Sequence, residues 1–243
     1  MAHGIAKWNG STWEALGSGL GLDDGGTWAE QGCAFALAVD SQHNLYVGGS
    51  FLSAGGVPAK FIAKWSPSCG TWSALGSGME DYVEEIATSD TTVYAAGQFA
   101  NAGGVAGTAR LAQWNGVTWA PVRPLGTAGP NGYVIALSSG GGSLYAGGNF
   151  TSIGGVATSY VARWDGTNWH PLGVGISGGA VVALEYAGGV VYAGGNFDSA
   201  GGQPASRIAK WDGVQWAPLG DGVNDSVVSL APFGGGLYYY NRT

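Results

Sequence analysis

The stretch YVARWDGTNWHPLGVGISGGAVVALEYAGGVVYAGGNFDSAGGQPAS, residues 160–206, is the clearest copy of a unit that recurs along the whole chain. Its apolar residues alternate with small or polar residues over short segments, a pattern typical of β-strands rather than helices. Gly-Gly and Asp-Gly pairs separate these segments, as expected for tight turns. The stretch therefore predicts short antiparallel strands, four to a unit.

Two half-units alternate along the sequence. One begins with aliphatic-Ala-x-Trp and runs through a second Trp to Leu-Gly; its first Trp recurs at Trp8, Trp65, Trp114, Trp164 and Trp211. The other has an apolar strand followed by Leu/Val-Tyr-x-x-Gly, at 45–51, 93–99, 144–150 and 191–197. A fifth copy, LYYYN at 237–241, has lost its glycines. Such self-similarity at a nearly fixed period predicts a repeat architecture.

The turns between the Trp strands carry their own signal. Asp-Gly at 165–166 and 212–213 and Asn-Gly at 9–10 and 115–116 predict two-residue hairpin turns. The second repeat has the longer loop 66–70 instead. Regular four-strand units of 40–50 residues are typical of propeller blades. The innermost strand of each blade is predicted at 34–40, 83–89, 133–138, 180–185 and 226–231.

The chain begins with an outer hairpin, 5–16, and ends with an inner hairpin, 226–240. The two halves complement each other, so we predict that they pair and close the ring, which would remove exposed strand edges. The predicted fold is all-β: one five-bladed β-propeller of four-stranded antiparallel blades over residues 1–243. The blades are expected at about 34–76, 83–125, 133–173, 180–220, and 226–240 together with 1–17.

The order of strand, Gly-Gly hairpin, Tyr-x-x-Gly-Gly, long loop, Trp with Asp, and second Trp resembles kelch and galactose-oxidase-type propeller repeats. The consensus of these copies, LYAGGNF…AGG…(I/V)A(R/K)WDG…W..LG.G, is also similar to repeats of large secreted bacterial proteins and fungal cell-surface cortical markers. The resemblance covers nearly the whole chain. It implies the propeller fold and an extracellular or cell-surface location, and it says little about chemistry.

Charge and composition exclude several classes of protein. The net charge is −7, and the nine Lys and Arg residues are scattered without a basic run. Binding to nucleic acid or to an anionic membrane surface would need a cationic patch. No apolar run approaches the roughly 18 residues needed to span a bilayer. The opening MAHGIAKW lacks the features of a signal peptide. Cys33 and Cys69 are expected to be free thiols rather than a disulfide framework.

The residues that recur in every unit are expected to be structural. The motif Trp residues are predicted to pack between adjacent blades, where each buries a large area, although they could also serve as sugar platforms. The Gly-Gly pairs are predicted to allow positive φ angles or a close approach of strands. A phosphate-binding loop would need a helix behind it, and none is expected.

One inner-strand residue departs from its column. At the inner-strand position that lines the predicted channel, four repeats have the small residues Ala36, Ala136, Ala183 and Ser229. The second repeat has Glu85 there, with Glu84 beside it. Either Glu85 points into a wet channel or the second blade is shifted. Paired carboxylates can hydrolyse glycosides, yet the other inner strands offer only Asp40 and Glu185. A glycosidase-like enzyme is therefore the less favoured alternative.

The loops that join successive blades differ most between units, and loops on a rigid scaffold commonly carry function. The longest loop, 17–32, holds Trp28, the only Trp outside the repeat. An exposed Trp beside polar groups could anchor a partner or stack on a sugar, or it could fold over the first blade. The predicted binding residues are Asp23, Asp24, Trp28, Glu80, Asp81, Tyr82, Glu85, Asn131, Asn224 and Asp225.

We predict a non-enzymatic module for protein–protein interaction or assembly, with no catalytic residue, metal or cofactor. The three His residues lie at different repeat positions, and no Cys or His spacing matches a zinc site. Asp23 and Asp24 lack the spacing of a calcium loop. The alternative is a lectin with repeated sites, for which the recurring Asn149 and Asn196 in NFTS and NFDS are the only candidates.

Overall fold

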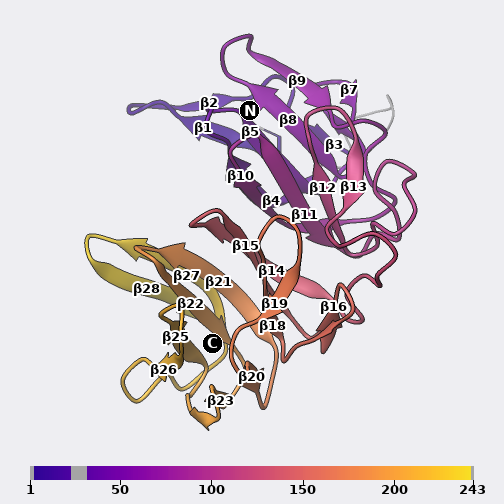
Figure 1. Cartoon of the computed structure of the whole chain (residues 1–243). Helices are drawn as coiled ribbons and strands as arrows, with labels where there is room; N and C mark the ends of the chain where they lie inside the picture. Colours follow the sequence, from indigo (N-terminus) through magenta and orange to yellow (C-terminus); the bar gives the residue numbers. More distant parts are fainter. Residues whose placement is uncertain (1–2, 23–31, 242–243) are drawn as a thin grey trace. The chain divides into compact units, whose positions relative to one another are not determined.

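A computed structural model describes residues 3–22 and 32–241 of the chain (Figure 1). The chain divides into two compact units, Met1–Pro121 and Val122–Thr243, which are described separately. Every regular element in the described residues is a β-strand. Nothing in that part of the chain forms a helix long and apolar enough to cross a membrane. The sequence prediction of an all-β chain is confirmed.

The first unit is built on two four-stranded antiparallel sheets. One sheet contains β4 (Cys33–Val39), β5 (Leu45–Ser50), β8 (Ile62–Ser66) and β9 (Thr71–Ala74) in that order. The other contains β10 (Val83–Ser89), β11 (Thr92–Gly97), β12 (Leu111–Trp114) and β13 (Trp119–Pro121). Smaller sheets join β3 (Leu20–Gly21) to β6 (Ser53–Ala54) and β7 (Val57–Pro58), and β1 (Ala6–Trp8) to β2 (Trp13–Ala15).

The second unit repeats this plan. Its four-stranded sheets are β14 (Val134–Gly140), β15 (Ser143–Gly148), β18 (Val161–Trp164) and β19 (Trp169–Pro171), then β21 (Val181–Ala187), β22 (Val190–Gly195), β25 (Ile208–Trp211) and β26 (Trp216–Pro218). The smaller sheets are β16 (Ser152–Ile153) with β17 (Val156–Ala157), and β20 (Ile176–Ser177) with β23 (Ser199–Ala200) and β24 (Gln203–Pro204). A last hairpin joins β27 (Val227–Phe233) to β28 (Gly236–Asn241).

Each inner strand carries a β-bulge at the same place in its pairing with the next strand. The bulge lies between Val83 and Glu85 in β10, and between the equivalent residues of β4, β14, β21 and β27. Glu85 consequently has the same register as Ala36 and Ala136. The possibility that the second repeat is shifted is therefore wrong, and Glu85 is a true substitution within the column.

Successive sheets pack face to face within each unit. In the first unit β10 packs on β4 and β5, and in the second β21 packs on β14 and β15, and β27 on β21 and β22. The phenylalanine that ends each Tyr-x-x-Gly segment is fully buried, as Phe51, Phe99, Phe150 and Phe197 show. Burial of an aromatic side chain contributes about 2–3 kcal/mol relative to its exposure, so these residues anchor the repeats.

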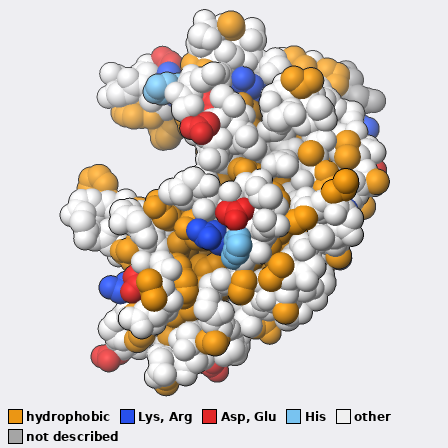
Figure 2. Space-filling view, viewed as in Figure 1, with side chains coloured by type: hydrophobic (Ala, Val, Ile, Leu, Met, Phe, Trp, Pro, Cys, Tyr) orange, Lys and Arg blue, Asp and Glu red, His pale blue; other side chains and the backbone are white. Residues whose placement is uncertain are grey.

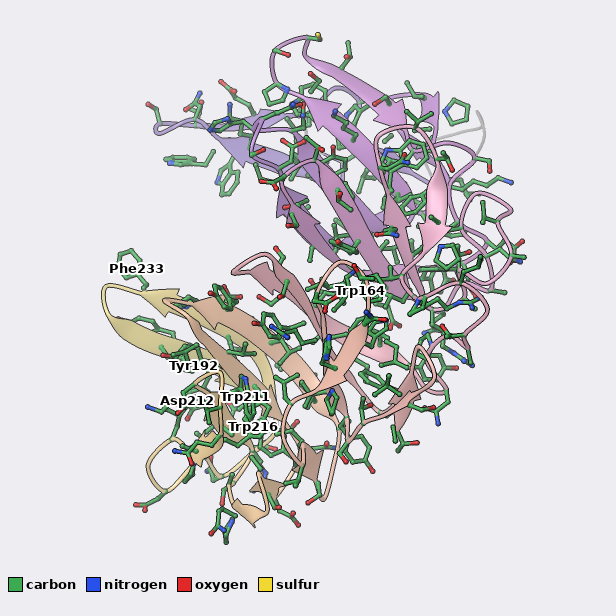
Figure 3. The ribbon with its side chains drawn as sticks, viewed as in Figure 1. Trp164, Tyr192, Trp211, Asp212, Trp216 and Phe233 are labelled. Atoms are coloured by element: carbon green, nitrogen blue, oxygen red, sulfur yellow. The ribbon has the colours of Figure 1, made fainter. Side chains whose placement is uncertain are left out.

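The second Trp of the repeat links one repeat to the one before it. Its indole Nε1 donates a hydrogen bond to a backbone carbonyl 44–56 residues earlier. The bonds run from Trp72 to Leu16, Trp119 to Leu75, Trp169 to Val122 and Trp216 to Leu172. Each second Trp also contacts the first Trp of its own hairpin; Figure 3 shows Trp211 beside Trp216 in the second unit, with ring centroids 5.6 Å apart.

The Trp hairpins turn one residue later than the sequence predicted. The last strand pair is Trp164 with Trp169, so four residues form the loop. The Asp165 carboxylate accepts hydrogen bonds from the backbone N–H groups of Thr167 and Asn168, at 2.8 and 2.7 Å. Asn9, Asn115 and Asp212 do the same in their turns. The backbone N–H of Asp165 also donates to the carbonyl of Asn168 at 3.1 Å, so the side-chain cap supports a tight turn centred one residue later than the sequence predicted. The longer loop at 66–70 is confirmed.

The structure does not confirm the predicted pairing of the first and last hairpins. In the described residues, β1 and β2 form a two-stranded sheet by themselves, and β27 and β28 form another. Four-stranded sheets thus arise in the four repeats where the chain supplies both halves in succession. No closed sheet is found within the residues that the structure describes, so the fifth blade and the closed ring stay predictions.

Candidate functional site

Tyr82, which precedes β10 in the first unit, contacts two aromatic rings, of which Phe35 is exposed and Phe61 is partly buried. It makes edge-to-face contacts with Phe35 of β4 and with Phe61, which precedes β8; the centroid distances are 6.2 and 5.6 Å. Tyr82 remains 41% exposed and Phe35 53% exposed. These three residues are called the Tyr82 surface below. Rings held edge to face present a rigid apolar area with little side-chain entropy left to lose on binding.

The backbone fixes Phe61 in an unusual conformation. Its φ of 64° lies in the left-handed region, where bulky residues are rarely found. The N–H of Phe61 donates to the carbonyl of Phe51 at 2.8 Å, and its own carbonyl accepts from the N–H of Gly49 at 3.0 Å. The loop between β5 and β8 is therefore closed at this residue, and Phe61 is held against Tyr82.

The other repeats hold large residues at the same point. Arg110, Tyr160 and Arg207 have φ values of 63–66° and donate in the same way to Phe99, Phe150 and Phe197. In the opening repeat this place is taken by Gly4, at a φ of 72°. Sequence reasoning missed this position. The available signal was that the residue just before aliphatic-Ala-x-Trp is large and variable while its neighbours recur.

Acidic groups border the Tyr82 surface. The Asp81 carboxylate accepts the backbone N–H of Tyr82 at 2.8 Å and so orients the loop. Both oxygens of Glu80 accept from the side-chain amide of Asn101, each at 3.1 Å. The carboxylate of Glu85 accepts the N–H of Ile86 at 3.3 Å. The predicted residues Glu80, Asp81, Tyr82 and Glu85 therefore all belong to one short stretch at the start of β10.

The other predicted residues are not part of this surface. Asp23, Asp24 and Trp28 lie outside the described residues. Asn131, Asn224 and Asp225 belong to the second unit, where Asn131 accepts from the N–H groups of Thr151 and Ser152 and Asp225 from the N–H of Ser226. These bonds are local supports of loop backbone.

The recurring asparagines of the lectin hypothesis also support the backbone. The side-chain oxygen of Asn149 accepts the N–H of Tyr133, and that of Asn196 accepts the N–H of Ala180, both at 2.6 Å. A Cβ on Gly132 or Gly179 would lie within 2.7 Å of these oxygens. Where the repeat instead has Asp81 or Asp225, that carboxylate accepts the equivalent N–H. The recurrence of Asn149 and Asn196 thus has a structural cause.

The two other carboxylates of the inner strands, Asp40 and Glu185, differ in their surroundings. Asp40 is buried and accepts from Asn44, Gln42 and the hydroxyl of Tyr46. Burial opposes its ionisation, but these hydrogen bonds outweigh burial and lower the pKa of Asp40. Burial raises the pKa of Glu185 on β21. The ionised carboxylate of Asp40 therefore stabilises the turn between β4 and β5.

Charged side chains are few on the face seen in Figure 2, and hydrophobic side chains reach the surface between them. Within the described residues, no three His, Cys, Asp or Glu side chains are grouped closely enough to hold a metal ion. Cys33 and Cys69 are both free and exposed. What the Tyr82 surface offers is a rigid aromatic contact with a negatively charged border.

No family model matches the chain, and no curated protein matches it. Solved structures do. A chain in the crystal structure of a nidogen/laminin complex matches with a TM-score of 0.54 at 14% identity, over 86% of this chain and 72% of that one. The extracellular domain of the putative hybrid two component system BT4673 from B. thetaiotaomicron matches with a TM-score of 0.54 at 10% identity, over 89% of this chain and 27% of that one. These likenesses support a β-propeller-like all-β fold.

Proposed function

We propose that this chain is a non-enzymatic extracellular or cell-surface binding module that holds a protein partner through the Tyr82 surface. The observation that carries the proposal is the exposure of Phe35 and Tyr82 in spite of their mutual contact. Aromatic residues are enriched in protein interfaces, and a few of them commonly supply most of the binding energy. Hydrogen bonds within the loops leave the rings fixed before any partner arrives.

The charge of the surface indicates the kind of partner. Glu80 and Asp81 border the rings, and the whole chain has a net charge of −7. A partner segment with Lys or Arg beside an apolar anchor would complement this border. One structural neighbour belongs to a nidogen/laminin complex and the other is an extracellular domain, which favours testing for a protein partner outside the cell.

The test is a selection of random peptides displayed on phage against the immobilised chain. We expect the selected peptides to combine an apolar residue with Lys or Arg. Tyr82→Ala should weaken their binding at least tenfold, which corresponds to about 1.4 kcal/mol. Tyr133→Ala is the matched control, because Tyr133 is also exposed and precedes the equivalent strand in the second unit. Higher ionic strength should also weaken the binding of these peptides to the parent chain.

Two results would contradict the proposal. One is a set of peptides that bind the parent chain and Tyr82→Ala equally well. The other is binding to a glycan array without any selected peptide, which would return the lectin hypothesis in spite of the structural role of Asn149 and Asn196.

A further inference from the structure

The residue just before each aliphatic-Ala-x-Trp motif has a backbone that suits glycine. A positive φ is costly for a residue with a Cβ, and it persists where another interaction compensates for the cost. Gly4 shows that glycine satisfies this backbone in the opening repeat. The other four repeats nevertheless have large side chains there, namely Phe61, Arg110, Tyr160 and Arg207. The contacts of these side chains therefore indicate what the large residues are for.

In the first unit, a ring of the following repeat covers the strained residue. Tyr82 precedes β10 and packs edge to face on Phe61, with ring centroids 5.6 Å apart. Phe35, at the bulge of β4, also contacts Tyr82, at 6.2 Å. The strain at Phe61 is thus compensated by packing inside the chain.

In the second unit, the equivalent of the covering ring is small. Ala180 directly precedes β21, as Tyr82 precedes β10. Tyr160 has a φ of 63° and packs against the hydrophobic core of this unit, but it remains partly exposed. Within the described residues, no aromatic ring contacts Tyr160 as Tyr82 contacts Phe61. One face of the strained tyrosine therefore lacks the partner that the first unit supplies.

The next repeat leaves a cation without a partner in the same way. Ser226 precedes β27, where a covering ring would again stand. Arg207 has a φ of 66° and is partly exposed. In the part of the chain that the structure describes, its guanidinium takes part in no hydrogen bond or ion pair. The nearby carboxylate of Asp225 accepts the backbone N–H of Ser226 instead, at 2.6 Å. Nothing in the described fold thus compensates for the strain at Arg207.

Backbone contacts place Tyr160 and Arg207 on either side of Ala180. The carbonyl of Tyr160 accepts the N–H of Gly148, the last residue of β15, and β15 packs on β21 directly after Ala180. The carbonyl of Arg207 accepts the N–H of Gly195 at 3.0 Å. The residue after Gly195 donates its N–H to the carbonyl of Ala180 at 3.2 Å. The two strained side chains therefore border one short stretch of the second unit.

We propose that Tyr160 and Arg207 form a second binding surface, which takes a segment of a partner protein with an aromatic residue close to an Asp or Glu. The aromatic ring packs on Tyr160 as Tyr82 packs on Phe61, and the carboxylate pairs with the Arg207 guanidinium. The first unit supplies the model for the ring contact, and the unpaired cation sets the charge of the ligand. This preference is opposite in charge to that of the Tyr82 surface and does not depend on it.

The binding test uses the Tyr82→Ala chain, in which the first surface is disabled, to select random peptides displayed on phage. The selected peptides should combine an aromatic residue with Asp or Glu. In that background, Ala180→Tyr supplies a covering ring from within the chain and Arg207→Gln removes the charge, so each should weaken binding at least tenfold. Arg163→Gln removes another partly exposed cation of the same unit and should change binding less than twofold.

Three results of the selection would overturn the proposal. They are the absence of any selected peptide, selected peptides without this combination, and peptides that bind either the Ala180→Tyr or the Arg207→Gln chain as tightly as the parent. Because the Tyr82 surface is disabled throughout, none of these results would contradict a partner at that surface.

Thermal unfolding separates a binding role of Arg207 from a structural one. Asn tolerates a positive φ better than most residues, so Arg207→Asn should leave the unfolding midpoint within about 1 °C of the parent or raise it. Phe61→Asn is matched in backbone but loses the contact with Tyr82, and it should lower the midpoint by about 4 °C or more. Equal losses from the two substitutions would show that the Arg207 side chain supports the fold, and would overturn the proposal.

Discussion

At the scale of single residues, the second Trp of each repeat does two tasks. Its ring fills space beside the first Trp, and its N–H reaches the repeat before it. Strict recurrence led to the correct prediction that these residues pack between repeats, but the prediction is wrong for Trp8 and Trp13, which are exposed. The sequence could not distinguish them, because the difference depends on which neighbour is present and not on the motif.

Trp119→Phe separates the hydrogen bond from the packing of the ring. The variant keeps most of the buried aromatic surface but loses the bond to Leu75, so it should lower the free energy of unfolding by about 1–2 kcal/mol. Trp13→Phe is the matched control and should change stability by less than about 0.5 kcal/mol when measured in dilute solution. Denaturant unfolding would measure both, and equal effects of the two substitutions would refute this role for the Trp119 N–H.

Asp40 makes the first unit sensitive to acid. Hydrogen bonds from Asn44, Gln42 and Tyr46 lower its pKa in the folded state below the unfolded value of about 3.9. The unfolded chain therefore binds the proton more readily, and the contribution of Asp40 is complete above about pH 4. It is lost as the pH falls through the lowered folded pKa.

Asp40→Asn should therefore destabilise the chain by about 1–3 kcal/mol at pH 7 and flatten its stability profile in acid. Thermal unfolding followed by circular dichroism between pH 7 and pH 2 would check both effects. A variant that loses stability below pH 4 as steeply as the parent would show that another carboxylate governs the acid transition.

At the scale of elements, the predicted strand order inside each repeat is confirmed by four sheets. Inner strands were located to within about two residues, since their apolar residues alternate clearly; 83–89 is observed as predicted. The short hairpins β16–β17 and β23–β24 were not predicted. Their two-residue strands are held by the Gly-Gly turn and by contact with the second Trp, as Gly154 and Gly201 show, and periodicity cannot detect segments of that length.

Gly147→Ala tests how closely successive sheets must approach. The new Cβ would overlap Val181 and lie 3.0 Å from Leu184, so the sheets could not keep their spacing. Overpacking of this kind costs about 1–3 kcal/mol. Gly236→Ala is a suitable control, because a Cβ there meets only ordinary contacts of 3.5 Å and more. If thermal unfolding shows the two substitutions to be equivalent, close sheet packing is not the reason for glycine at position 147.

At the scale of the whole molecule, the sequence predicted repeats and their class more successfully than their closure. Each repeat specifies contacts with its neighbours through Gly, Val and Trp, but it does not specify what meets the first and last faces. The candidate site was predicted in part: Tyr82, Glu80 and Asp81 were identified from loop variation, while Phe35 and Phe61 were not. Phe61 becomes visible only through its backbone conformation, and Phe35 only through the fold that brings β4 beside Tyr82.

Hydrogen exchange should show that amides of strands packed on both faces are better protected than amides of strands with an open face. The β21–β22 pair is packed on both faces, by β14 and β15 on one side and β27 on the other, whereas β28 has an open face. We expect the amides of β22 to be protected at least tenfold more strongly than those of β28 in dilute solution. Within the first unit, β11 should be protected more strongly than β1. Uniform protection along the chain would show that it opens in a single cooperative step.

The tryptophan bonds also give the chain a direction. The indole N–H groups of Trp72, Trp119, Trp169 and Trp216 each reach a carbonyl of the repeat before. An in-frame duplication of residues 165–211 would therefore leave no donor without its acceptor, because the inserted copy would accept from its successor as it donates to its predecessor. Evolution can lengthen or shorten such a protein by whole repeats without redesigning any contact except the two at its ends.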